Sequence, residues 1–127
     1  LIAHMGPPDM RVPIGHALRW PAAPPARARM PLAGMTLTFE DADLVAFPCL
    51  RLAREAGIVG GTAPAILNAA NEVAVAAFLD GRLGFMGIPE AVEAALNAVP
   101  AEPADTLEAV LDADARARVV AAGAGVG

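Results

Sequence analysis

The stretch that decides the fold is residues 62–79, TAPAILNAANEVAVAAFL, a long run of mostly helix-favouring residues. Two glycines at residues 60–61 break the chain just before it. Thr62 is a residue type that caps helix N-termini, and Pro64 falls in the first turn, where its missing N–H costs little. Asp and Gly at residues 80–81 end the pattern. The sequence therefore predicts one long helix here.

Helical periodicity continues on both sides of that stretch. It predicts a helix that begins after Phe47-Pro48 and ends at Gly57, and another over residues 88–98. The helix over residues 88–98 should pack against the long helix through an apolar stripe, which comprises Val92, Ala95, Leu96 and Val99. Residues 47–127 are therefore expected to form a helical bundle.

Two aspartates predict further short helices near the end of the chain. Asp105 has capping-box spacing to Glu108, and Asp114 is placed to cap a last helix. The glycine-rich residues 123–127 should fray.

The part of the chain before the bundle has a different character. Residues 1–5 have the pattern of a short strand that runs into a proline-rich loop. Residues 12–20 predict a short helix with Pro13 in its opening turn, and residues 21–31 predict an extended connector. Residues 37–39 predict a brief strand. The expected fold is mainly α, in three parts: a strand, loop and short helix (1–20), a connector (21–46) and a helical domain (47–127).

The composition predicts what fills the core. Hydrophobic residues make up 56% of the 127 residues and aromatic residues only 4%, so helices should pack closely around small side chains such as alanine. We expect Trp20 and the four phenylalanines to anchor this core. Phe78, on the apolar stripe of the long helix, should be buried.

Charge and cysteine content exclude several classes of protein. The net charge of −5 argues against a nucleic-acid partner, and the absence of lysine excludes a Schiff-base lysine or a P-loop in this segment. The acidic residues lack histidine or cysteine companions and predict a solvated face instead of a zinc site. Cys49 cannot form an internal disulfide, which fits a reducing compartment, and we expect the cytoplasm. No apolar run approaches the ~18 residues of a membrane span, and no signal peptide is evident.

Four short motifs occur in order along the chain: GPPDMRVPI (6–14), FPCL (47–50), LNAANEVAV (67–75) and DAR (114–116). Together they resemble the 1-deoxy-D-xylulose 5-phosphate reductoisomerases, over nearly the whole chain. The resemblance implies the carboxy-terminal portion of an enzyme that uses NADPH and Mg or Mn to form 2-C-methyl-D-erythritol 4-phosphate, in isoprenoid precursor synthesis. It also implies a homodimer, and it identifies residues 1–20 as the end of an α/β catalytic domain, with a remnant strand and loop. The sequence departs from the family at His4 and Met5, where glutamine and leucine are usual.

The resemblance also implies which site residues this chain holds. The family's dinucleotide-binding fold, metal ligands and catalytic side chains precede the matching part. This fragment should therefore contain no catalytic residue and no metal ligand, bind no cofactor by itself, and be inactive alone. The resemblance places Pro8, Asp9 and Met10 on the wall of the substrate and nicotinamide pocket. A structural turn with Met10 in the core is the alternative.

Three polar residues of the third motif share one helical face, because Asn68, Asn71 and Glu72 stand at i, i+3 and i+4. This spacing permits half of a metal or substrate site. A di-iron site would need Glu-x-x-His pairs, however, and no histidine follows His16. We therefore expect a structural role, with the amides satisfying backbone groups of loops. For the chain as a whole, the alternative to an enzyme part is an autonomous helical interaction module.

Overall fold

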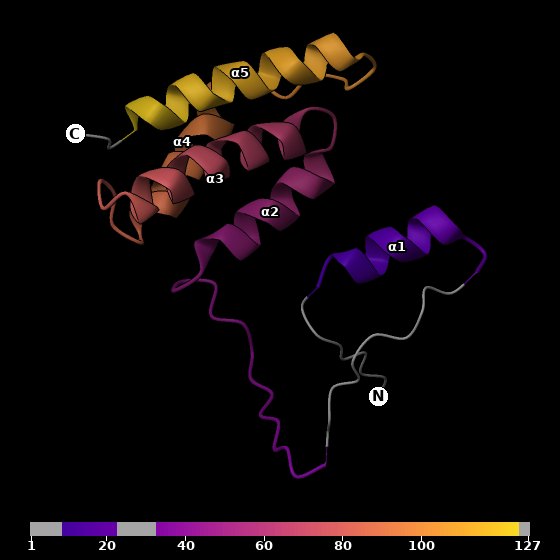
Figure 1. Ribbon diagram of the computed structural model, residues 1–127. Coiled ribbons are helices and arrows are strands. Elements are labelled where there is room, and N and C mark those ends of the chain that lie inside the picture. Colours follow the sequence, from indigo (N-terminus) through magenta and orange to yellow (C-terminus); the bar gives the residue numbers. More distant parts are fainter. Residues whose placement is uncertain (1–8, 23–32, 125–127) are drawn as a thin grey trace. The chain divides into compact units, whose positions relative to one another are not determined.

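The computed structural model describes residues 9–22 and 33–124, and the regular structure of those residues consists of five helices (Figure 1). This confirms the mainly α class. The chain divides into two compact units, residues 1–40 and 41–127. The boundaries expected from the sequence, after residues 20 and 46, stay predictions. No described helix is both long and apolar enough to cross a bilayer.

The first unit contains one described helix, α1 (Arg11–Arg19), which confirms the helix predicted over residues 12–20. Asp9 stabilises its start, because the Asp9 carboxylate accepts the backbone N–H of Arg11 at 3.0 Å. No residue of α1 is buried, and its apolar side chains Val12, Ile14 and Leu18 are exposed. The described part of this unit therefore has no core of its own.

The strand predicted over residues 37–39 is wrong, because residues 35–43 have no regular structure. A strand needs a partner for its backbone N–H and C=O groups, and no described residue supplies one. The other predicted strand, residues 1–5, and most of the connector, residues 23–31, lie outside the described residues.

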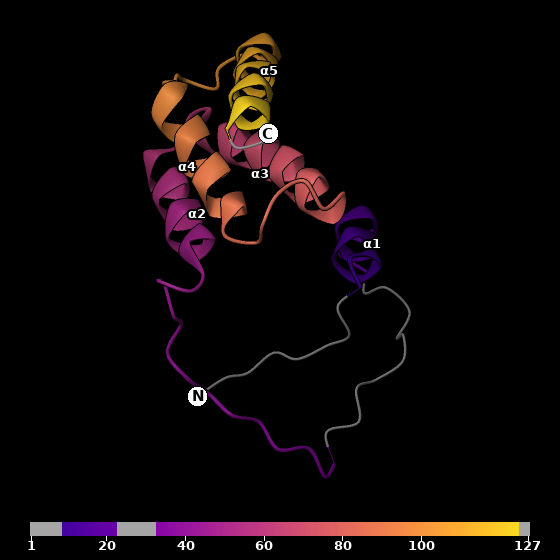
Figure 2. The same cartoon turned by 90° about the vertical axis from the view of Figure 1, so that its left-hand side faces the viewer.

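The second unit is a bundle of α2 (Pro48–Val59), α3 (Ala63–Leu79), α4 (Gly87–Ala98) and α5 (Leu107–Gly123). The long helix α3 contacts all three others, and Figure 2 shows α2 and α4 next to each other. The bounds of α3 and α4 confirm the two helices predicted over residues 62–79 and 88–98 to within one residue.

Alanine fills the centre of this bundle. Ala113, Ala117 and Ala121 form a buried stripe along α5 at four-residue spacing, and it faces Ala69 and Ala70 of α3 within one core cluster. Such small side chains let the helix backbones approach closely, which confirms the thin core expected from composition. The core also holds three of the four residues predicted for α4, since Val92, Ala95 and Val99 are buried and Leu96 is partly buried.

The expectation of aromatic anchors is wrong. Trp20 is 73% exposed, and each of the four phenylalanines is also exposed. A ring has no room where alanines set the distance between helices, so the bundle places its rings at the ends of helices and in loops. The bulkiest fully buried side chain is Ile66.

A pair of hydrogen bonds joins the α2–α3 turn to the loop between α4 and α5. The backbone N–H of Thr62 donates to the carbonyl of Glu102 at 2.9 Å, and the Thr62 hydroxyl accepts the N–H of Glu102 at 3.0 Å. Thr62 occupies the N-cap position of α3 as predicted, but its side chain makes no capping bond to that helix. Its buried hydroxyl serves the neighbouring loop instead.

Three predicted helix ends differ from the structure. Helix α2 continues past Gly57 to Val59 and stops at Gly60, which has a positive φ of 73°. Residues 107–123 form one helix, not two, and Thr106 caps it in place of Asp105 by accepting the N–H of Ala109. Asp114 starts no helix, because its carboxylate pairs with Arg118 one turn later.

Replacing Phe78 by alanine should lower the free energy of unfolding by about 1–2 kcal/mol, less than the ~3–5 kcal/mol expected for a fully buried phenylalanine. Phe78 is 38% exposed, and its ring makes an edge contact with Phe85 at a centroid distance of 6.0 Å. Urea unfolding followed by circular dichroism measures the change. Leu79→Ala, at an exposed neighbour, is the control. A loss as large as that of a buried ring would contradict the exposed position.

Candidate functional site

The first candidate element is the segment before α1. The Asp9 carboxylate accepts the Arg11 guanidinium at 2.7–3.1 Å, and this pairing raises the pKa of Arg11. Met10 lies between them with 70% of its surface exposed. Met10 is not buried within this chain, and the alternative that places it in the core of the full-length enzyme stays a prediction. Pro8 lies outside the described residues.

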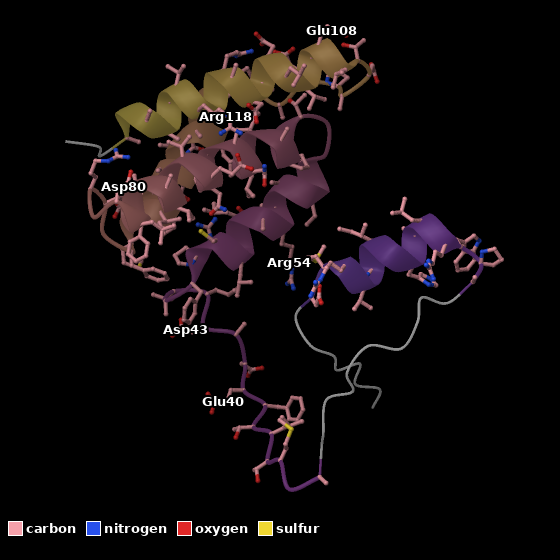
Figure 3. All side chains as sticks on the ribbon, in the orientation of Figure 1. Glu40, Asp43, Arg54, Asp80, Glu108 and Arg118 are labelled. Carbon is pink, nitrogen blue, oxygen red and sulfur yellow. The ribbon has the colours of Figure 1, made fainter. Side chains whose placement is uncertain are left out.

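The second candidate element is the polar face of α3. The Asn68 amide donates to the Glu72 carboxylate at 3.1 Å, and the other oxygen of Glu72 accepts the Arg118 guanidinium at 2.7 Å. Arg118 also donates to both carboxylate oxygens of Asp114, at 2.7 and 3.2 Å. Figure 3 shows Arg118 between α5 and α3. The expected bond from the amide to a loop is therefore wrong for Asn68, because its amide donates to a carboxylate one turn away on the same helix.

This network changes the pKa values of Glu72 and Arg118, in each case in the direction that favours the charged form. Arg118 and Asn68 donate to Glu72 and lower the pKa of that carboxyl, while Asp114 and Glu72 raise the pKa of Arg118. Glu72 and Arg118 are thus held in their charged forms, which suits a link between helices and not a proton-transferring acid or base.

Neutralising Glu72 as Glu72→Gln should lower the melting temperature at neutral pH and make no difference in acid. The pKa of Glu72 in the folded chain lies below its ordinary value of 4.5, so the stabilisation is complete above that value. It is lost as the pH falls through the lowered pKa. Thermal unfolding of both proteins across this range measures it. Glu40→Gln is the control, since Glu40 is exposed, lies outside the helices and makes no ion pair among the described residues. A pH-independent difference would contradict the assignment.

The third candidate element is an open apolar pocket of about 490 Å³ between the start of α2, the middle of α3 and the start of α4. Asn71, the remaining polar residue of the motif, lies on its wall. The three motif residues therefore do not form one site. Asn68 and Glu72 belong to the contact with α5, and Asn71 belongs to this pocket.

Cys49 lies on the wall of the same pocket and is partly buried. Burial raises the pKa of its thiol, so the neutral form is favoured. A nucleophilic cysteine needs the opposite shift, and Cys49 therefore behaves as the packed small side chain expected from the sequence.

The acidic residues of the bundle are exposed except for Asp114, which is half-buried, and most have arginine partners. The pairs beyond the Arg118 network are Glu55 and Glu93 with Arg51, Asp80 with Arg82, and Glu102 and Asp112 with Arg116. Within the described residues no group of three or more histidine, cysteine or acidic side chains could hold a metal ion. These pairs are best explained as links within and between helices.

Comparison with known proteins places this arrangement in a family. The family described as the DXP reductoisomerase C-terminal domain matches residues 5–120. This chain belongs to that family. The match confirms the assignment made from the four motifs. Among the curated reductoisomerases, that of Methylococcus capsulatus is 56% identical over 123 residues and that of Cellvibrio japonicus is 50% identical over 127. Each alignment covers 95% of this chain and 31% of the relative, so the chain spans about a third of a DXP reductoisomerase.

Solved structures agree with the sequence comparison. The 1-deoxy-D-xylulose 5-phosphate reductoisomerase of Zymomonas mobilis, in complex with NADPH, has a TM-score of 0.77 and 43% identity to this chain. The alignment covers 96% of this chain and 33% of that one. A DOX-P reductoisomerase in complex with NADPH, fosmidomycin and magnesium has a TM-score of 0.75 and 34% identity. The helical bundle is thus a shared part of DXP reductoisomerases.

Sequence reasoning missed two features of the site. Arg118 was not singled out, although its i, i+4 spacing from Asp114 was a visible signal for an ion pair. The sequence does not predict the pocket, because its composition places Phe47 and Phe85, both on the pocket wall, in the core. No sequence signal distinguishes a ring that lines an open pocket from one that is buried.

Proposed function

We propose that this chain is the carboxy-terminal portion of an enzyme that rearranges 1-deoxy-D-xylulose 5-phosphate and reduces the product to 2-C-methyl-D-erythritol 4-phosphate. The family match over residues 5–120 carries the proposal. The enzyme would use NADPH and Mg or Mn, and two relatives of solved structure bind NADPH, one of them with magnesium as well. The full-length enzyme would be a cytoplasmic homodimer, with a phosphosugar as substrate and no nucleic-acid or membrane partner.

In this proposal the chain supports the active site without performing chemistry. The described carboxylates are scattered or paired with arginine and do not fit a metal site, so the metal ligands would come from the part of the enzyme outside this chain. NADPH would supply the hydride. The fragment alone would bind neither group and would be inactive.

The segment Pro8, Asp9 and Met10 would form part of the wall of the substrate and nicotinamide pocket. The ion pair between Asp9 and Arg11 holds the backbone on both sides of Met10, and the exposed thioether is free to contact a planar ring. Asn68, Asn71 and Glu72 would have structural roles, as members of the link to α5 and of the apolar pocket.

Met10→Ala in the full-length enzyme should raise KM for NADPH or substrate by about tenfold while leaving the melting temperature nearly unchanged. The reason is that an exposed side chain contributes little to folding but can contribute to a binding wall. Met10→Leu, which keeps the volume, is the control and should retain most of the binding. Loss of thermal stability with unchanged kinetics would assign Met10 to the core of the enzyme.

The experiment that tests the function is NADPH consumption by the full-length product of the same gene, with deoxyxylulose phosphate and Mg²⁺ or Mn²⁺. This 127-residue chain is measured in parallel. Activity only in the longer protein is the expected result. Activity of the fragment alone would overturn the proposal that its active site lies elsewhere.

The alternative, an autonomous helical interaction module, rests on one observation: residues 41–127 have their own hydrophobic core. A reading frame that extends upstream into a glycine-rich dinucleotide fingerprint and an acidic metal cluster favours the enzyme. A start codon just before Leu1, or a folded full-length product without activity, favours the module.

A further inference from the structure

The apolar pocket of the bundle is bordered by large side chains that the bundle leaves uncovered. Phe47, Leu50 and Phe85 line the pocket, and each is more than half exposed. Val75 and Ile88 form its floor with less exposure. Three uncovered large apolar side chains around one concavity are unusual on a solvated surface and are typical of a site that contacts another polypeptide.

Asn71 adds a polar requirement to this pocket. Its side chain is partly buried, lies on the wall, and makes no hydrogen bond among the described residues. An amide offers both a donor and an acceptor, which is the combination that a peptide backbone satisfies. No charged residue lines the pocket, so nothing there would hold a phosphate or carboxylate. The matching occupant is a peptide segment with an apolar side chain.

The length of the relatives indicates where such a segment comes from. The chain covers 31% of the Methylococcus capsulatus enzyme and 33% of the Zymomonas mobilis structure. In those proteins the bundle is accompanied by the remaining two-thirds of one polypeptide. A segment tethered to the bundle in the same chain has a high effective concentration, which favours it over a separate partner.

We propose that the pocket lined by Phe47, Phe85 and Asn71 is a socket for a segment of the full-length protein that lies outside this chain. An apolar side chain of that segment fills the space against the two rings, and its backbone pairs with the Asn71 amide. This inference rests on the proposed function in one respect, because it requires the chain to be the carboxy-terminal portion of a longer protein.

Cys49 reports on the socket, since it lies on the wall and is the only cysteine of the chain. The experiment labels the full-length protein and the 127-residue chain with N-ethylmaleimide under identical conditions. Cleavage after arginine releases residues 30–51, in which the label is quantified by mass spectrometry. We expect labelling of Cys49 to be about tenfold slower or more in the full-length protein, because a filled socket must open first. Equal rates in the two proteins would overturn the proposal.

Two variants separate the socket from general effects of folding. Asn71→Ala in the full-length protein should speed labelling towards the rate of the 127-residue chain. Asn68→Ala removes an amide of the same helix on the face towards Arg118, and it should leave the labelling rate unchanged. Equal effects of both substitutions would overturn the proposal. It would also be overturned if labelling of the 127-residue chain became slower as the concentration of that chain is raised, because a second copy would then fill the pocket.

The NADPH assay on the same full-length preparation keeps the two proposals apart. An active enzyme with unprotected Cys49 overturns the socket and leaves the function standing. A protected Cys49 in a folded, inactive protein overturns the function and supports the contact.

Discussion

Replacing Ile66 by alanine should destabilise the bundle by about 2–5 kcal/mol, among the largest effects of any single truncation in this chain. Ile66 is 0% exposed and has the largest volume of the fully buried side chains. Its neighbours in the core include Ala69 and Ala70, which have no side chain long enough to fill the space left behind. The cost within this range depends on how far the larger neighbours Leu52 and Val92 move into the space.

The matched control for this prediction is Ile58→Ala, near the end of α2. Ile58 is 79% exposed, so the same chemical truncation should change the free energy of unfolding by no more than about 0.5 kcal/mol. Urea unfolding of residues 41–127, followed by circular dichroism at helical wavelengths, gives both values. Similar midpoints for the two variants would mean that α3 does not present Ile66 to the core.

Periodicity predicted α3 and α4 to within one residue, because both helices have clear signals at their ends. Helix α3 begins after a pair of glycines and ends at Leu79 before Asp80 and Gly81, as expected. Helix α4 likewise has Pro89 in its first turn and Pro100 just after its end. A capping aspartate proved a weaker signal: Asp114 is a good cap in isolation, but within a continuous helix its carboxylate pairs with Arg118. Local propensity gave way to a side-chain pair one turn apart.

The prediction of the core residues is wrong where the distance between helices decides which side chains are buried. Counting aromatic residues suggests that they form the core, yet Trp20 and Phe47 are exposed. Buried stripes of alanine, such as Ala113 and Ala117, set the helices too close for rings. Which residue type fills a core depends on the distance between backbones, and that distance is a property of all the helices together.

The candidate site was predictable only where motifs carried it. The resemblance singled out Asp9 and Met10, and the structure adds the ion pair with Arg11 and the exposure of the thioether. The division of the third motif, with Asn68 towards Arg118 and Asn71 on the apolar pocket, could not be read from spacing. Residues three apart on a helix lie about 60° apart around its axis, which is enough to contact different neighbours.

Gly61→Ala should be nearly as damaging as the loss of Ile66, for a different reason. Gly61 has a φ of +54°, and a methyl group on its Cα would overlap the carbonyl oxygen of Glu102. That carbonyl accepts the N–H of Thr62, so relieving the overlap also breaks the pair of hydrogen bonds between the two loops. Backbone strain and the lost bonds together should cost about 3 kcal/mol or more.

Two glycines of the same region separate these causes. Gly60 has a φ of +73° but open space around its Cα, so Gly60→Ala should show backbone strain alone, about 1–3 kcal/mol. Gly57 lies within α2, also in open space, and Gly57→Ala should stabilise the bundle by about 0.5–1 kcal/mol through helix propensity. The urea midpoint should therefore be highest for Gly57→Ala, lower for Gly60→Ala and lowest for Gly61→Ala. If Gly61→Ala were as mild as Gly60→Ala, the close approach of Glu102 would not exist in solution, and the loop between α4 and α5 would be held by the helices it joins.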